Sequence, residues 1–410
     1  MQLNNNIHLP GFEAFVITNS LQFEDCVHIH VELKIQPHRC PVCHRWTNKV
    51  HDYRKQKVKH TKMFTRHTYI FYRKRRYKCE HSDCPKKGFP EDNPLVERYQ
   101  RQSVEFKQAM GLEVIHGKNF ADVAARMGTS PTTVMRRFDA IGSSMLNETK
   151  ELPSTIAIDE YKGDAGGEKY QTIIADPVDR RTLDILPDRK KDTLKAYLHH
   201  HGQKVNKVVM DMSQSFKAAV DQALGGPIVI ADRFHFCRYI HWALERVRIK
   251  VQKEFIDYDR KKCKRMKHAF HKKPEDLTSK QRWYLDYYLS QSDYLREAYQ
   301  LKEAYRHWFE EAKALGADHL KVIKDRLYEF YDLVRSSGVV EFQKAIETLQ
   351  NWQKEIINSF AFDLNNGYIE GLNNQTKVIK RNAFGFQRFD RFRMRILLHH
   401  QYKRINTRVA

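Results

Sequence analysis

The sequence has no apolar run that approaches the roughly 18 residues of a membrane-spanning helix, which excludes a helical integral membrane protein. The basic segment and apolar stretch of a secretion signal are missing from its start, Met1-Gln2-Leu3-Asn4-Asn5-Asn6, so we expect a cytoplasmic protein. Hydrophobic residues make up 41% and charged residues 30%, a balance typical of folded rather than disordered chains. At about 100–200 residues per domain, 410 residues allow two to four domains.

Cysteine is scarce as well, with seven residues, an odd number that argues against a disulfide framework. Four of them form two pairs, Cys40-Pro41-Val42-Cys43 and Cys79-Glu80-His81-Ser82-Asp83-Cys84. Two such pairs complete the tetrahedral sulfur site that zinc prefers, and four protein ligands leave no open position for catalysis. We therefore predict one structural Zn²⁺, with His44 and His81 as substitutes should a cysteine not bind. Free cysteines placed by chance are the alternative; a thioredoxin-like redox pair lacks the surrounding βαβ pattern.

Acidic residues are rare where basic residues gather. The chain has 72 Lys and Arg against 50 Asp and Glu, a net charge of +22, and the segment from Lys34 to Lys87 holds 17 Lys or Arg against three acids, which is +14. The run Phe71-Tyr72-Arg73-Lys74-Arg75-Arg76-Tyr77 has the pattern of a strand with an exposed basic face. We predict a hairpin between the cysteine pairs whose Arg73, Lys74, Arg75 and Arg76 neutralise DNA phosphates. A solubilising surface and a disordered basic tail are the alternatives.

Two short helices around a tight turn are predicted between Asn119 and Phe138. Asn119 can cap the first helix, Gly128 can end it in the left-handed conformation, and Ser130-Pro131 can cap and begin the second. The apolar seam between them consists of Val123, Ala124, Met127, Val134 and Phe138. The pattern resembles a helix-turn-helix whose second helix presents to a DNA groove the residues Thr132, Thr133, Arg136 and Arg137. A helical hairpin without DNA contact is the alternative.

From residue 154 the pattern changes to short apolar strands. Three antiparallel strands are predicted at residues 154–159, 170–176 and 181–186, and two more, at 207–211 and 227–232, alternate with helices. Residues from about 239 to 360 lack strand signals and are predicted to be helical. We therefore predict an α/β multidomain protein with an N-terminal zinc-binding domain, a helix-turn-helix, and a ribonuclease H-like mixed-sheet core with a large α-helical insertion.

Acids stand at the ends of the predicted core strands. Asp159 and Asp211 each follow an apolar strand without an intervening Pro or Gly. A residue at the carboxyl end of a strand lies at the rim of the sheet, where several acids can converge on one cation. Taken alone, a strand-final Asp is more often a helix cap or turn residue. In so basic a protein, however, a carboxylate cluster is favourable when it holds Mg²⁺ or Mn²⁺ near a phosphate backbone.

A third acid follows the helical stretch, in Asn366-Gly367-Tyr368-Ile369-Glu370-Gly371-Leu372-Asn373-Asn374. With this block the chain resembles bacterial insertion-sequence transposases with a DDE domain, specifically the ISL-three family. The resemblance covers nearly the whole length, although the second cysteine pair, with four intervening residues, departs from the usual pattern in its spacing and local sequence. It is carried by the cysteine-rich start, the helix-turn-helix, Ile158-Asp159-Glu160, Val209-Met210-Asp211-Met212, Asp232-Arg233-Phe234-His235, Lys377 to Arg381, and the tail with Phe384-Gly385-Phe386, Phe389, Phe392 and Arg393.

The resemblance implies a transposase that binds the terminal inverted repeats of its element and target DNA, as a homodimer in the synaptic complex and away from membranes. Asp159, Asp211 and Glu370 would be the catalytic triad, holding two Mg²⁺ or Mn²⁺ ions for strand cleavage and strand transfer. Two rival functions stay open: a zinc and helix-turn-helix DNA-binding regulator with an inactive catalytic fold, and a ribonuclease H-like nuclease without strand transfer.

Helical spacing adds residues beside the triad. Lys377 is about two turns from Glu370 and Asn374 one turn, so both share its face, and Lys377 can hold a DNA phosphate. Lys380 and Arg381 are further DNA-binding candidates, and Asp232 and His235 are candidates to support the acids. The predicted domains are residues 1–95 (zinc-binding), 96–150 (helix-turn-helix), 151–238 (first part of the core), 239–360 (helical insertion) and 361–410 (core helices carrying the third acid).

Overall fold

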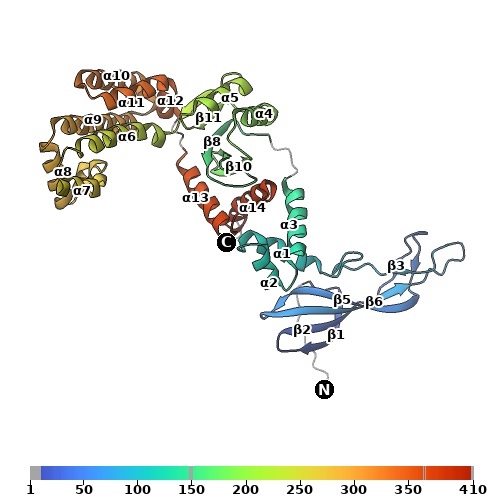
Figure 1. Ribbon diagram of the computed structural model, residues 1–410. Helices are drawn as coiled ribbons and strands as arrows, with labels where there is room; N and C mark the ends of the chain where they lie inside the picture. Colours follow the sequence, from blue (N-terminus) through green and yellow to red (C-terminus); the bar gives the residue numbers. More distant parts are fainter. Residues whose placement is uncertain (1–10, 147–150, 363, 365, 408–410) are drawn as a thin grey trace. The chain divides into compact units, whose positions relative to one another are not determined.

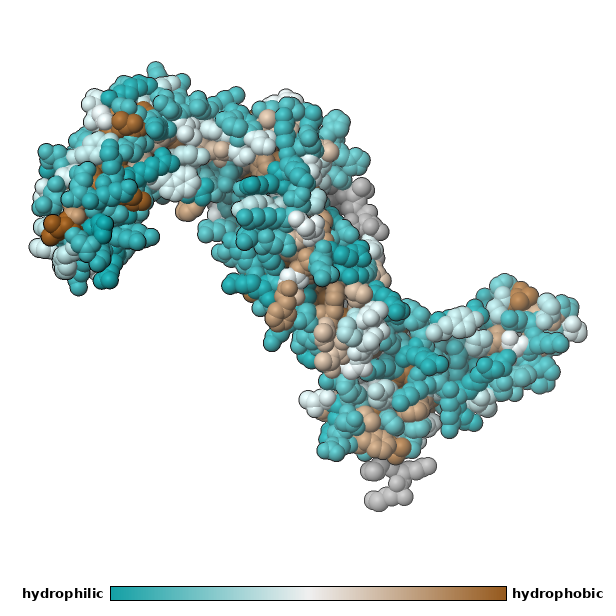
Figure 2. All heavy atoms as spheres, in the orientation of Figure 1, coloured by the Kyte–Doolittle hydropathy of each residue, from teal (hydrophilic) through white to brown (hydrophobic). Residues whose placement is uncertain are grey.

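The computed structural model describes residues 11–146, 151–362, 364 and 366–407 (Figure 1). The opening residues, which lack the pattern of a secretion signal, lie outside this described part. The chain divides into two units, residues 1–147 with 382–384 and residues 148–381 with 385–410. Among the described helices, none is long and apolar enough to cross a membrane. The face shown in Figure 2 is mainly hydrophilic, with scattered hydrophobic spots.

The first unit begins with a five-stranded sheet in the order β1-β2-β6-β5, with β7 beside β6. Its strands are β1 (Phe15–Gln22), β2 (Cys26–Leu33), β5 (Val50–Met63), β6 (Arg66–Tyr77) and β7 (Phe89–Pro90). β5 and β6 form the predicted antiparallel hairpin between the cysteine pairs, and β2 runs parallel to β6. The hairpin turn consists of Phe64 and Thr65, both with positive φ, as the right-handed twist of two joined strands favours.

The buried face of β6 changes along the strand. Up to Tyr72 the strand pairs with β2, and Tyr72 packs into the core of this sheet. Beyond that residue β6 leaves β2, and its opposite face is buried because Tyr77 packs with Cys79 and Phe89. Arg75 lies on this second face and is only 4% exposed. The prediction of an exposed basic face is therefore wrong for Arg75.

Three helices complete the first unit: α1 (Val104–His116), α2 (Phe120–Met127) and α3 (Pro131–Leu146). The predicted helix-turn-helix is confirmed in detail. The side chain of Asn119 accepts a hydrogen bond from the backbone of Asp122, and Gly128 ends α2 at φ 60°. The five predicted seam residues are all buried. The Lys59 ammonium of β5 donates to the Gly128 carbonyl, which ties this turn to the hairpin.

The second unit contains a mixed five-stranded sheet in the order β10-β9-β8-β11-β12. The strands are β8 (Thr155–Tyr161), β9 (Gln171–Asp176), β10 (Arg181–Leu186), β11 (Lys207–Met210) and β12 (Ile228–Ala231). The first three pair antiparallel, and β8, β11 and β12 run parallel. This is the sheet that the alternation of strands and helices predicts.

Helices cover both faces of this sheet, because successive side chains of a strand point to opposite faces and those on both faces are apolar. Ile156 and Ile158 of β8 face a core built with α4 (Lys191–His201), α5 (Gln214–Leu224) and α6 (Arg233–Val251). Ala157 and Tyr161 face the opposite core, built with α13 (Gly367–Asn382) and α14 (Phe389–Thr407). Asp159 has the parity of Ala157 and Tyr161, so the strand register directs it to the side that α13 covers.

The stretch predicted to be helical contains helices throughout (Figure 1). They are α7 (Asp257–Arg265), α8 (Ser279–Ser290), α9 (Asp293–Leu315), α10 (Leu320–Ser337), α11 (Val340–Asn351) and α12 (Gln353–Phe362). Their apolar side chains pack with those of α6 in one hydrophobic core. α6 itself begins directly after β12, the last strand of the sheet. The strand ends, α6 and α13 therefore meet at one edge of the sheet.

Candidate active site and nucleic-acid interface

The three predicted acids line one pocket of about 330 Å³. Asp159 belongs to β8, and Asp211 directly follows β11. These two strands are parallel neighbours with Ile158 opposite Met210, so the register brings the two carboxylates together. Glu370 lies in the first turn of α13, on its exposed side. Residues 159 positions apart in the sequence thus share one cleft because a strand end and a helix start meet there.

Amide side chains fix the start of α13 against the sheet. The Asn373 Nδ2 atom donates to Asp159 Oδ2 at 2.8 Å. The backbone N–H of Asn366 donates to Asp232 Oδ1 at 3.2 Å, and the Asn366 side chain reaches the Ile158 carbonyl at 3.4 Å. These bonds hold Glu370 beside the strand ends. Asn373 escaped the sequence analysis, which selected its neighbour Asn374; both line the pocket.

The electrostatics of the cleft favour a bound cation. Burial, together with the negative charge of Asp211, raises the pKa of Asp159 to about 7. Burial lowers the pKa of His235, but its contacts with Asp211 and Asp232 outweigh burial and raise it to about 9. The Nδ1 atom of His235 makes a hydrogen bond to Asp232 at 2.8 Å and lies 2.5 Å from Asp211 in an ion-pair contact. Burial and the neighbouring charge of Asp211 both disfavour the ionised form of Asp159, and a cation bound here would offset that penalty.

The donor set fits a hard divalent ion. Carboxylate oxygens of Asp159, Asp211 and Glu370 face the cleft, and oxygen donors suit Mg²⁺ or Mn²⁺. The Asp211 Oδ1 atom is buried and lies 2.5 Å from His235 Nδ1, so a cation that binds this oxygen would displace the ion pair. A compact group of potential ligand atoms within 4.8 Å consists of Asp211, Asp232 and His235. Asp159 and Glu370 lie outside that group but line the same cleft.

Basic residues surround the acids unequally. Lys377, predicted from its helical spacing, lines the cleft and makes no ion pair among the described residues. Lys380 instead pairs with Asp164, and Arg381 is exposed. Arg238 of α6 lines the cleft as well and was missed by the sequence analysis. Its position three residues after His235 was the available signal, because residues at that spacing share a helix face.

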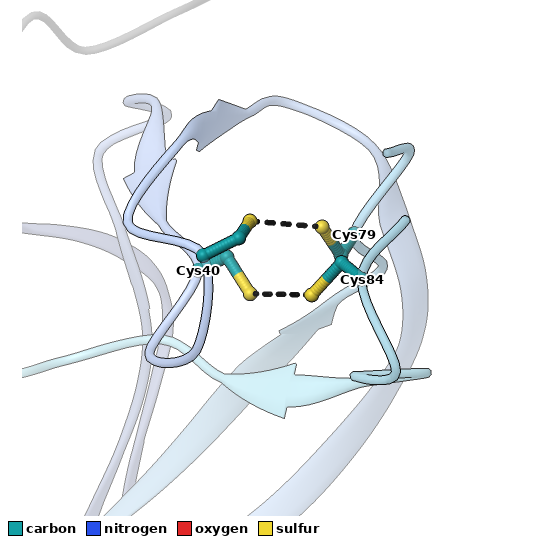
Figure 3. A group of neighbouring side chains, drawn as sticks. Cys40, Cys79 and Cys84 are labelled. Carbon is teal, nitrogen blue, oxygen red and sulfur yellow. Dashed lines mark hydrogen bonds between the residues drawn. The ribbon is translucent and has the colours of Figure 1, made fainter. Parts of the chain in front are cut away.

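The four cysteines converge as their spacing predicts. Their sulfur atoms point toward one another and lie within 4.8 Å of one another (Figure 3). The pairs Cys40–Cys84 and Cys43–Cys79 are each 3.6 Å apart. A tetrahedral zinc with Zn–S bonds of about 2.3 Å places its sulfurs about 3.8 Å apart, so the geometry fits a structural zinc. The second cysteine pair joins the cluster despite its four intervening residues.

A basic groove of about 970 Å³ runs beside the β5–β6 hairpin. Eight cationic side chains line it, and none of the described lining residues is acidic. These cations are Arg54, Lys55, Lys57, Lys59, Lys74, Arg76, Arg98 and Arg101. Of the predicted DNA contacts in β6, Lys74 and Arg76 line this groove, although Arg76 also pairs with Asp52 at 3.0 Å. Arg73 pairs with Glu32 and stacks on Tyr53. Arg75 is buried and holds Glu32 and Glu91, so it is not a DNA contact.

Of the four residues predicted to contact DNA from the second helix of the helix-turn-helix, two are exposed and two make local contacts. Thr132 and Arg136 are exposed. Ser130 caps the helix by accepting a hydrogen bond from the Thr133 backbone N–H, the Thr133 hydroxyl contacts the Ser130 hydroxyl, and Arg137 donates to Gln100 at 3.0 Å. Thr132 and Arg136 are therefore the side chains of this set that stand clear of local contacts.

Comparison with protein families assigns each part of the chain to a transposase. A family model described as a transposase of the ISL3 type matches residues 156–396, more than half of the chain. A helix-turn-helix domain of transposase family ISL3 matches residues 91–142. A zinc finger of the transposases of IS204, IS1001, IS1096 and IS1165 matches residues 36–84.

Individual relatives agree with the family. The transposase for insertion sequence element IS1001 of Bordetella parapertussis is 24% identical over 367 residues, 87% of each chain. The transposase for IS1557 of Mycobacterium tuberculosis is 26% identical over 251 residues, 53% of this chain and 54% of that protein. An ATP-dependent protease of Lactococcus lactis is 34% identical over 89 residues, 21% of this chain and 29% of that protein. The chain belongs to the ISL3 family of DDE transposases.

Proposed function

We propose that this transposase binds the terminal inverted repeats of an insertion sequence in the bacterial cytoplasm and catalyses both cleavage and strand transfer. One observation carries the proposal: Asp159, Asp211 and Glu370 line a single cleft in a chain with a net charge of +22. Clustered carboxylates repel DNA phosphates unless cations lie between them. Two Mg²⁺ or Mn²⁺ ions, when bound, would activate the attacking hydroxyl and stabilise the leaving oxygen.

The residues of the chain have distinct tasks in this proposal. Asp159 and Asp211 hold the cations from the strand ends, and Glu370 completes the set from α13. Asn373 keeps Asp159 oriented and favours its ionised form by donating to Oδ2. The Lys377 ammonium holds a phosphate of the strand whose end reaches the acids. The carboxylates act as ligands, so the chemistry requires no protein nucleophile.

DNA is brought to this cleft by the first unit. The basic groove neutralises backbone phosphates, and Thr132 and Arg136 face a DNA groove from α3. The zinc site closes the base of the hairpin that carries six of the eight cations of the groove. Two ends of one element must be cut and joined, which favours one active site per end and hence a homodimer.

The test is an in vitro reaction with the purified protein, Mg²⁺ and DNA from the ends of the element. Nicking at the element end and joining to a second duplex are both expected, and Asp211→Asn should abolish both while it retains DNA binding. Nicking without joining would favour a nuclease. Binding without either reaction, at any concentration of Mg²⁺ or Mn²⁺, would favour the regulator and refute the proposal.

A further inference from the structure

The sheet of the first unit has two edges, and they differ in charge. β5 forms one edge and lines the basic groove, whereas β1 forms the other edge (Figure 1). The eight residues of β1 include no Lys, Arg, Asp or Glu and no proline. The other long strands of this sheet, β2, β5 and β6, all carry charged residues. A chain with a net charge of +22 thus keeps one edge strand free of charge.

The backbone of β1 offers hydrogen bonds on its outer side. The Ala14 carbonyl accepts from the N–H of Lys34, and the N–H of Phe23 donates to the Cys26 carbonyl. Because inward and outward groups alternate along an antiparallel strand, these two bonds fix which residues of β1 turn away from β2. The outward residues are Ile17, Ser20 and Gln22. Among the described residues β2 is the only strand that pairs with β1, so these outward groups have no strand partner.

Apolar side chains are exposed along the same strand. Val16, Ile17 and Leu21 are 40–48% exposed, and Phe23, one residue beyond the strand, is 47% exposed. Natural sheets usually protect an edge with lysine, proline or a bulge. β1 has a bulge between Ile17 and Asn19 but neither of the other two protections. An uncharged, exposed edge of this kind is suited to pairing with another strand.

The strand that fits this edge best is β1 of a second copy. DNA fits poorly, because β1 offers no cation to a phosphate. Two β1 strands related by a two-fold axis pair antiparallel, and no like charges then face each other. The same pairing at the other edge would bring together the cations of two β5 strands, Lys55, Lys57 and Lys59 of each copy. Charge therefore favours β1 as the edge at which two copies meet.

We propose that two copies of this chain pair through β1, antiparallel about a two-fold axis, and so join their two sheets into one. This inference deepens the homodimer of the proposed function and rests on that function for the need of two copies. In the joined sheet the two β5 strands form the outer edges. The two basic grooves thus lie far from the interface and stay open to DNA.

The oligomeric state of the full-length protein, measured by analytical ultracentrifugation without DNA, tests the interface. We expect the wild type to be a dimer. Asn19→Lys places like charges at the middle of the paired strands and should raise the dimer dissociation constant about a hundredfold or more. Asn48→Lys is the matched control, because Asn48 is also exposed in the first unit but lies outside β1. It should leave the dissociation constant unchanged.

Two further variants separate direct pairing from a folding defect. A mixture of Asn19→Lys and Asn19→Asp chains should recover dimers, since opposite charges then face each other across the axis. Ser20→Pro removes one outward N–H and should weaken the dimer, while the zinc content and DNA binding of both Asn19 variants and of Ser20→Pro stay as in the wild type.

A monomeric wild type would overturn the proposal, whether residues 1–10 or another segment covers the edge. Equal dissociation constants for Asn19→Lys and Asn48→Lys, or a mixture of the two Asn19 variants that stays monomeric, would overturn it as well. The proposed function is tested separately: a protein that dimerises through β1 but neither nicks nor joins DNA would refute that function and leave this interface in place.

Discussion

Replacing Arg75 by Ala should unfold the hairpin locally rather than remove a DNA contact. The guanidinium lies 3.0 Å from Glu32, 3.6 Å from Glu91 and 2.8 Å from the Leu33 carbonyl. Glu91 is only 1% exposed, so its carboxylate would stay buried without its cation. Removing one partner of a buried ion pair costs about 3–5 kcal/mol. The opening equilibrium of the hairpin should therefore rise by about two to three and a half powers of ten.

Hydrogen exchange of the β5–β6 amides measures this opening within the full chain. Arg73→Ala is the matched control, because Arg73 lies on the same strand and pairs with Glu32 but is half-exposed, so its loss should change the opening of the hairpin far less than the loss of Arg75. Adding Glu91→Gln to Arg75→Ala should recover part of the protection, since it removes the stranded charge. Unchanged exchange in Arg75→Ala, combined with weaker DNA binding, would show that our structural assignment of Arg75 is wrong.

Three further outcomes are expected. Elemental analysis should find about one zinc per chain and a loss of it in Cys40→Ser, whereas Cys263→Ser, at a buried cysteine of α7, should keep it; equal zinc in both variants would contradict the site. If the basic groove contacts about six phosphates, DNA affinity should fall about a thousandfold between 50 and 200 mM salt, and a flat response would exclude the groove as the contact surface. Asn373→Ala should slow joining about 10- to 100-fold with DNA binding retained, as for other groups that orient a metal ligand, and a wild-type rate would refute that role.

Local signals in the sequence were enough for much of the fold. Asn119 and Gly128 mark the two ends of α2, the first helix of the helix-turn-helix, because cap chemistry depends on only a few neighbouring residues. Apolar strands ending in Asp159 and Asp211 predict adjacent strand ends, because parallel strands place their carboxyl ends at one edge. The convergence of four cysteines also follows from their spacing.

Long-range contacts decided what the sequence could not reveal. The alternation of side chains along β6 shows which of them share a face of the strand. Arg75 is nevertheless buried, because Glu32 and Glu91 from other parts of the chain pack against it. The bond from Asn373 to Asp159 joins residues 214 positions apart, and no local pattern predicts it. In the sequence alone, Arg238 likewise looks like any other exposed cation of a basic helix. Only the fold shows that it lines the cleft of the acids without an acidic partner among the described residues.

The central claim is that Glu370 acts with Asp159 and Asp211 on one set of cations. Its most direct test is the rate of strand joining by Glu370→Gln, which keeps the side-chain volume and removes one negative charge. Stabilisation of the transition state by metal ions is worth several kcal/mol, and about 1.4 kcal/mol is a factor of ten in rate. We predict that joining falls about a thousandfold or more while affinity for terminal DNA stays near that of the wild type. Joining at a near wild-type rate would contradict the triad and direct attention to Glu160 and Asp232.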